Sequence, residues 1–171
     1  MLFAVIRMRG QYVISTFVSQ QQYFPKCDVM NDSMLIKSLT YLGATPFFIA
    51  LWLSWADQPF LGVMGAHWFI SYALIILSFM AGTLWGQMVT ASRHIKAIAL
   101  ATNGIVLAAW FAYLLAAVAA VLLILALGFI GLYLLEARVL KRLDRPAYYL
   151  DLRLKVTALV VCAHVLMFWQ L

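Results

Sequence analysis

The chain has 171 residues, a formal net charge of +6, 66% hydrophobic residues and 11% charged residues, and its mean hydropathy is +0.97. Soluble domains average about 45–50% apolar and about 25% charged residues, so this composition excludes an ordinary soluble domain. The two cysteines, Cys27 and Cys162, are too few and too distant in sequence for a disulfide framework or a metal site. We expect Cys162, which lies in an apolar run, to pack as a small hydrophobic residue.

The N-terminal segment, residues 1–34, differs from the remainder of the chain because basic residues interrupt its apolar stretch. It lacks the uninterrupted apolar core and small-residue cleavage site of a signal peptide. We expect a loosely attached tail. An interfacial amphipathic helix is one alternative, and a translation start at Met30 or Met34 is another.

The remaining residues, 35–171, are predicted to form an all-α transmembrane domain. A bilayer core about 30 Å thick requires roughly 20 apolar residues in a helix. The long apolar run 97–137 would extend about 60 Å as one helix, twice that thickness, so we expect two helices joined by a tight turn near residues 111–116. The predicted membrane-spanning helices are residues 35–55, 65–86, 97–113, 117–137 and 156–171.

The distribution of charge favours five spans over four. Five spans place the N-terminal region, the loop at 87–96 and the loop at 136–155 on one side of the membrane. These segments, together with Lys37 at the N-terminal end of the first span, contain all 12 Lys and Arg residues. Because cytoplasmic loops carry an excess of Lys and Arg, the N-terminus is predicted to be cytoplasmic and the C-terminus outside. Five of the six tryptophans fall near the opposite interface, where aromatic belts occur: Trp52, Trp55, Trp68, Trp110 and Trp169.

The first predicted span is interrupted near its middle by Thr45 and Pro46. A proline inside a helix removes one backbone hydrogen bond and leaves a carbonyl group without its partner. Inside a bilayer such a group must be satisfied by a neighbouring segment. The sequence therefore predicts a polar contact to this point of the first span.

Small residues follow one side of the second predicted span, within "ILSFMAGTLWG". Ser78, Gly82 and Gly86 are four residues apart and share a helical face, which Trp85 flanks. Small residues allow close approach of helices in lipid. We call Ser78, Gly82, Trp85 and Gly86 the small-residue face. Packing against another helix of the same chain and packing between protomers are both consistent with it.

Isolated polar residues also occur within the predicted spans. Asn103 is expected to form an interhelical hydrogen bond, and His164 is expected to be a hydrogen-bonded packing residue, with a proton relay as the alternative. A membrane haem would need two histidines at matched depth on facing helices. His67 and His164 differ in depth by roughly 10 Å at 1.5 Å per residue. We therefore expect no cofactor.

No charged residue is expected deep within a span, because Glu136 lies near the end of the fourth one. Ion-coupled transporters and pumps place ionisable groups near the bilayer midplane. The sequence also contains no HExxH, GxSxG or P-loop motif. We expect the protein not to be an enzyme.

The loop "RVLKRLDRPAYYLDLRLK", residues 138–155, alternates basic and apolar residues. This pattern is typical of a short element that lies on anionic headgroups, with Tyr148 and Tyr149 as anchors. It accounts for the basic charge without nucleic acid as a partner. The residues expected to contact lipid headgroups are Arg138, Lys141, Arg142, Arg145, Arg153 and Lys155.

Three segments together resemble a family of small membrane proteins of unknown function, found in proteobacteria and including the mitochondrial transmembrane protein 69. They are "LGATPF" at 42–47, "YALIILSFMAGTLWG" at 72–86 and "RPAYYLDLRLKVT" at 145–157. The matching residues are Leu42, Gly43, Pro46, Phe47, Tyr72, Ala73, Ile76, Leu77, Ser78, Phe79, Gly82, Trp85, Gly86, Pro146, Tyr148, Leu152, Arg153 and Thr157. The resemblance covers residues 35–171 and implies a polytopic inner-membrane protein of about five helices. It implies no catalytic residues.

These observations favour a non-enzymatic bacterial inner-membrane protein that self-associates, holds anionic lipid on its basic face and supports membrane integrity. The alternative is a small-molecule or ion channel or transporter with a path lined by Ser78, Thr83, Asn103 and His164. A third option, an enzyme that acts on lipid or quinone, would use Tyr148, Tyr149, Asp151 and Arg153 at the inner interface.

Overall fold

A computed structural model describes residues 34–35, 38–57, 59–88, 95–140 and 147–171. The chain divides into two compact units, Met1–Ile36 and Lys37–Leu171, and the second contains every helix discussed below. The predictions for residues 1–33 fall outside the described residues.

The described part of the second unit is helical, which confirms the predicted all-α class. Residues 38–42 form a short helical segment, and the only strand-like feature of the described residues is an isolated bridge between Phe60 and Val63. The helices that follow residues 38–42 are α2 (Thr45–Trp55), α3 (Gly65–Met88), α4 (Ile95–Leu115), α5 (Val118–Leu140) and α6 (Ala147–Trp169).

Four of these helices, α3 to α6, are long and apolar enough to cross a membrane. Helix α2 has 11 residues and extends only about 16 Å. The predicted span at 35–55, which the sequence interrupts near Thr45 and Pro46, is divided in the structure by a turn at Gly43 and Ala44. The cause is Pro46, which lacks a backbone N–H and is tolerated only in the first turn of a new helix.

The turn before α2 leaves the carbonyl of Gly43 outside the helical hydrogen-bond pattern, because the N–H of Phe47 donates to Ala44 instead. The hydroxyl of Tyr72, on α3, donates to this carbonyl over 2.7 Å. This contact confirms the prediction that a neighbouring segment satisfies the backbone near the proline. It also joins the start of α2 to the middle of α3.

The long apolar run at 97–137 is divided between α4 and α5, with the turn at Ala116 and Ala117. Helix α6 begins at Ala147, ahead of the predicted residue 156, so residues 147–155 belong to a bundle helix rather than to a separate surface element. The helix accommodates its charged residues because Arg153 and Lys155 each form an ion pair.

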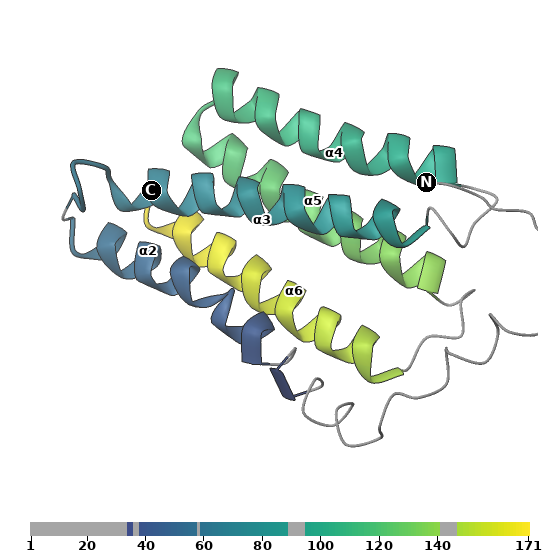
Figure 1. Ribbon diagram of the computed structural model, residues 1–171. Coiled ribbons are helices and arrows are strands. Elements are labelled where there is room, and N and C mark those ends of the chain that lie inside the picture. The colour runs from purple at the N-terminus through teal and green to yellow at the C-terminus, as the bar shows by residue number, and fades with distance from the viewer. Residues whose placement is uncertain (1–33, 36–37, 58, 89–94, 141–146) are drawn as a thin grey trace, which may run out of the picture. The chain divides into compact units, whose positions relative to one another are not determined.

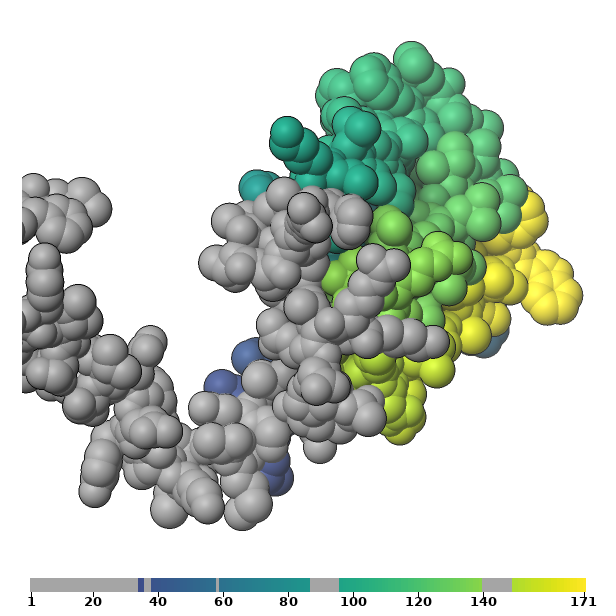
Figure 2. Space-filling model, turned by 90° about the vertical axis from the view of Figure 1, so that its right-hand side faces the viewer, coloured from purple at the N-terminus to yellow at the C-terminus, as the bar shows by residue number. Residues whose placement is uncertain are grey.

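Consecutive helices pack against one another, α2 also packs against α6, and α3 also packs against α5 (Figure 1). The centre of the bundle is filled by side chains that are fully buried: Phe47, Phe69, Leu77, Leu125, Phe129 and Met167. Helix α4 lies along an outer margin (Figure 2). Only 22% of its span residues are buried in the bundle, against 39% for α3.

The two ends of the bundle differ in chemistry. The C-terminal ends of α2, α4 and α6 lie at the same end as the N-terminal ends of α3 and α5 (Figure 1). This end includes the predicted aromatic belt: Trp52, Trp55, Trp68, Trp110 and Trp169. The cations of the described residues lie towards the other end: Lys96, Arg138, Arg153 and Lys155.

Candidate functional site

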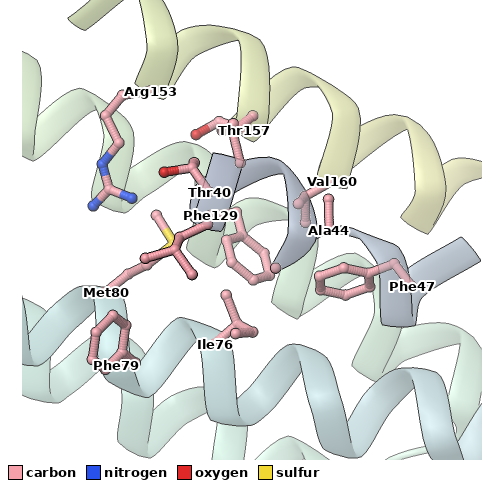
Figure 3. Close-up of a pocket in the computed structure, with 13 residues that line it drawn as sticks. Thr40, Ala44, Phe47, Ile76, Phe79, Met80, Phe129, Arg153, Thr157 and Val160 are labelled. Atoms are coloured by element: carbon pink, nitrogen blue, oxygen red, sulfur yellow. The ribbon is translucent and has the colours of Figure 1, made fainter. Parts of the chain in front are cut away.

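A pocket of about 260 Å³ lies among residues 39–44, α2, α3, α5 and α6. Figure 3 shows the residues that line it. Its walls are mostly apolar, with Phe47 and Phe129 at one side and Ile76, Phe79 and Met80 on α3. The polar side chains in its lining are Thr40, Arg153 and Thr157. The pocket thus combines an apolar interior with a guanidinium group at its margin.

Arg153 is held by a carboxylate inside the bundle. The Nε–H of Arg153 donates to Oε2 of Glu136 over 2.8 Å, and the hydroxyl of Tyr149 donates to Oε1 over 2.9 Å. Glu136 is only 2% exposed. A carboxylate buried this deeply requires an opposite charge and hydrogen bonds, and α6 supplies both.

Sequence reasoning did not foresee this ion pair. It treated Arg153 as a headgroup contact, and it treated Glu136 as a residue near the end of a span. The available signal was depth: both residues lie between one and two turns from the connection of two antiparallel helices. A lone acid in an apolar helix and a cation at the same height in the next helix are natural partners.

The ion pair leaves part of the guanidinium available. The Nε–H is used by Glu136, and within the described part of the chain the two terminal amino groups of Arg153 have no recorded partner. Figure 3 shows the side chain extending from α6 towards Met80 on α3. The Arg153 side chain is 15% exposed, and its remaining N–H groups can donate to an oxygen of a ligand at the pocket margin.

His164 lies behind the aromatic wall of the pocket. Its Nδ1 donates to the carbonyl of Val160 over 2.8 Å, since a carbonyl can only accept. The rings of Phe69, Phe129 and Phe47 surround it at centroid distances of 4.8, 5.5 and 5.9 Å. Its Nε2 is buried without a partner among the described residues. These contacts are those of a packing residue.

The small-residue face points away from the bundle. Ser78, Gly82, Trp85 and Gly86 are all exposed, and the Ser78 hydroxyl donates to the carbonyl of Leu74 in the preceding turn. A Cβ added at Gly82 or Gly86 would meet no described atom within 4 Å. Within the described residues, no helix of the same chain covers this face.

The residues of the alternative transport path are not gathered in one place. Ser78 and Asn103 are exposed, whereas His164 is 2% exposed. The side chains of Thr83 and Asn103 donate to carbonyls of their own helices, at Met80 and Ala99. None of the four path residues is in the lining of the pocket.

The predicted headgroup contacts have three different positions. Lys141, Arg142 and Arg145 lie outside the described residues. Arg138 is exposed, and Lys155 is exposed and donates to Asp151 over 2.6 Å. Among the three of these residues that the structure describes, only Arg153 turns into the bundle. No group of three His, Cys, Asp or Glu residues that could hold a metal ion occurs in the part of the chain that was described.

The three segments on which the family resemblance depends come together at the pocket. They are distant in sequence, yet each supplies two of its family-matching residues to the lining. These are Gly43 and Phe47 from the first segment, Ile76 and Phe79 from the second, and Arg153 and Thr157 from the third. The three segments therefore lie close together in space around the pocket.

The model of a protein family of unknown function (DUF3429) matches residues 33–169 of the chain. No curated protein and no solved structure matches the chain.

Proposed function

The chain belongs to the DUF3429 family, and we propose that it is a non-enzymatic protein of the bacterial inner membrane that self-associates and supports membrane integrity. We also propose, on the three shared segments, that the family includes relatives of transmembrane protein 69. The four apolar helices make it a multi-pass membrane protein. The single observation that carries self-association is the uncovered small-residue face of α3.

The exposed side of α3 combines open space at its glycines with large apolar side chains beside them. Gly82 and Gly86 have open space where a side chain would be, and the neighbouring Ile75 and Phe79 are 63% and 67% exposed. In lipid, small residues let two helices approach closely, and the larger side chains beside them add dispersion contacts. Because the described helices of the same chain do not use this face, a helix of a second protomer is its proposed partner.

We propose a five-span topology with the basic end in the cytoplasm. Residues 38–42 and α2 would form the first span as a broken helix, with the hydroxyl of Tyr72 compensating the break at Gly43. The described cations gather at one end of the bundle and five tryptophans at the other, a distribution that supports this orientation. Arg138 and Lys155, both exposed, would hold anionic headgroups at the cytoplasmic surface.

Self-association can be tested with two glycine variants of the full chain. Gly82→Leu would fill the small-residue face, whereas Gly104→Leu would add the same side chain at another open glycine, on α4. The proposal expects chemical crosslinking in native membranes, and a larger particle in mild detergent, for the unaltered protein and Gly104→Leu. It expects both signals to be lost with Gly82→Leu. A monomeric unaltered protein, or equal crosslinking of both variants, contradicts self-association through this face.

The orientation has a separate test. Cysteines introduced at residues 60 and 145, in a background without Cys27 and Cys162, should react with a membrane-impermeant thiol reagent from opposite sides of the membrane. Labelling from the same side would contradict the five-span arrangement. It would leave the test of self-association unaffected.

A further inference from the structure

We propose that the pocket binds one acidic phospholipid from the surrounding membrane, with its phosphate at Arg153 and one acyl chain in the apolar interior. The inference deepens the proposed lipid-holding role, on which it rests, by assigning that role to a particular site. It predicts selective binding of one molecule rather than general attraction to the basic surface.

The interior of the pocket fits a hydrocarbon chain. Phe47, Phe129 and Val160 are buried and line it, and Ile76 and Met80 close it on the side of α3. Such a surface offers an acyl chain dispersion contacts but gives a small polar molecule few hydrogen bonds. Two lining side chains, Leu39 and Phe79, are exposed at its margin, so the opening itself is bordered by apolar groups.

The polar margin of the pocket fits a phosphate. Arg153 presents the terminal N–H groups that Glu136 does not use, and Thr157 adds a hydroxyl nearby. Guanidinium groups bind phosphate oxygens through two parallel hydrogen bonds, which are charge-assisted. The hydrogen bond to Glu136 fixes the position of the guanidinium, so less conformational entropy is lost when an anion binds.

The location of the pocket selects a membrane lipid over a soluble anion. Arg153 lies at the basic end of the bundle, within two turns of the start of α6, and the apolar interior extends from it along α6 to Val160. In the proposed orientation the guanidinium is therefore on the headgroup side of that interior. An acidic phospholipid has the matching arrangement, because its charged phosphate lies at the membrane surface and its acyl chain extends inward from it. A free phosphate would leave the apolar walls without an occupant.

The test uses the full chain reconstituted into bilayers that contain a phospholipid with a photoreactive group on its acyl chain. One sample contains photoreactive phosphatidylglycerol and the other contains phosphatidylcholine with the same chain. After irradiation, labelled peptides are identified by mass spectrometry. The proposal expects labelling of lining segments of α3 and α6. Labelling should be stronger for phosphatidylglycerol by about ten-fold, because the phosphate of either lipid can reach Arg153 but the choline of phosphatidylcholine adds a cation that the guanidinium repels.

Substitutions at the margin separate a site from a charged surface. Arg153→Gln alone would leave Glu136 buried without its partner, so the informative variant is Glu136→Gln with Arg153→Gln, which preserves a neutral pair. This double variant should lose the preference for phosphatidylglycerol. Lys96→Gln, which removes an exposed cation on α4 at the same end of the bundle and outside the pocket, should retain it.

Substitutions in the wall of the pocket test whether the acyl chain of the lipid lies there. Val156→Trp introduces a large ring at a half-buried lining position and should reduce labelling of the pocket for both lipids. Leu154→Trp, at an exposed position of α6 that does not line the pocket, should leave labelling unchanged. Together the two pairs of variants locate headgroup and chain independently.

Three results would overturn the inference: equal labelling by the two lipids, equal loss of preference in the double variant and Lys96→Gln, or labelling unaffected by Val156→Trp. Failure of the proposed self-association is distinguishable, because the pocket lies within one protomer. Gly82→Leu should abolish crosslinking between copies and leave selective lipid labelling intact.

Discussion

The two sides of α3 show how differently the same residue type can behave in one helix. At its start, a Cβ added at Gly65 would collide with the backbone nitrogen of Ser54 on α2 and would lie 2.8 Å from the carbonyl oxygen of Ala50. Further along, a Cβ added at Gly82 would meet no described atom within 4 Å. One glycine permits a crossing of two helices, and the other lies on an uncovered surface.

This contrast shows that the spacing of glycines is a weak guide to packing within a chain. The pair Gly82 and Gly86 has the motif typical of helix contacts in membranes, yet the close approach inside the bundle occurs at Gly65, which belongs to no motif. The packed side of α3 should therefore control the stability of one protomer. The uncovered side should control what the protomer contacts in the membrane.

The largest effect should come from cavities on the packed side. Leu77 is fully buried, whereas Ile75, two residues earlier, is 63% exposed. Leu77→Ala should lower the free energy of unfolding by about 2–5 kcal/mol because its neighbours cannot close the cavity. Ile75→Ala should have little effect. Unfolding in mixed detergent and sodium dodecyl sulfate micelles, followed by circular dichroism, measures both, and equal losses would contradict the assignment of sides.

A smaller loss is expected when a side chain is added at the helix crossing. Gly65→Ala would press a methyl group into the backbone of α2, which cannot move as a flexible side chain can. We expect the free energy of unfolding to fall by about 1–3 kcal/mol. Gly104→Ala, in open space on α4, is the control for the intrinsic effect of replacing glycine in a helix. A Gly65→Ala protein as stable as this control would show that the crossing is looser than described.

The hydrogen bond at the break before α2 should contribute less. Tyr72→Phe removes the hydroxyl that donates to the Gly43 carbonyl and retains the ring that packs edge-on against Phe47. The expected loss is about 1 kcal/mol. Ser71→Ala, whose hydroxyl donates only within its own helix, should change the same unfolding measurement less. If Tyr72→Phe leaves the free energy of unfolding unchanged, another group satisfies the carbonyl of Gly43.

The smallest effect should occur on the uncovered side. Gly82→Ala adds a methyl group where no described neighbour lies, and alanine favours a helix over glycine by up to about 1 kcal/mol. Protomer stability in detergent should therefore stay the same or rise slightly. A clear loss of stability under conditions where the protein is monomeric would place Gly82 in a contact within the chain. It would contradict the assignment of Gly82 to the uncovered side of α3.

Much of the fold follows from apolar runs and their interruptions. The positions of α3, α4 and α5 and of the C-terminal part of α6 could be anticipated because runs of this length and hydropathy have few structural solutions in a bilayer. The break at Pro46 and its need for a partner were also predictable from backbone chemistry. The identity of that partner, Tyr72, was not, because it lies 29 residues away and depends on how α2 and α3 cross.

The candidate site was less accessible to sequence reasoning. Arg153 was singled out as one cation among several, and its carboxylate partner and the pocket beside it were both missed. Patterns along one helix report which residues share a face, whereas Glu136 and Arg153 meet because α5 and α6 form an antiparallel hairpin. The extension of α6 back to Ala147, which brings Arg153 into the bundle, also depends on that pairing.

The amino-acid sequence by itself determined that this chain is helical, that it belongs in a membrane and that its charge is unevenly distributed. These properties depend on composition and on distance along the chain, because lipid imposes the same length and hydrogen-bonding demands on every segment. Only the tertiary structure decided which glycine lies at a helix crossing, which cation is internal and where a pocket opens. Those properties depend on the relative placement of helices, which side-chain packing sets and no single segment specifies.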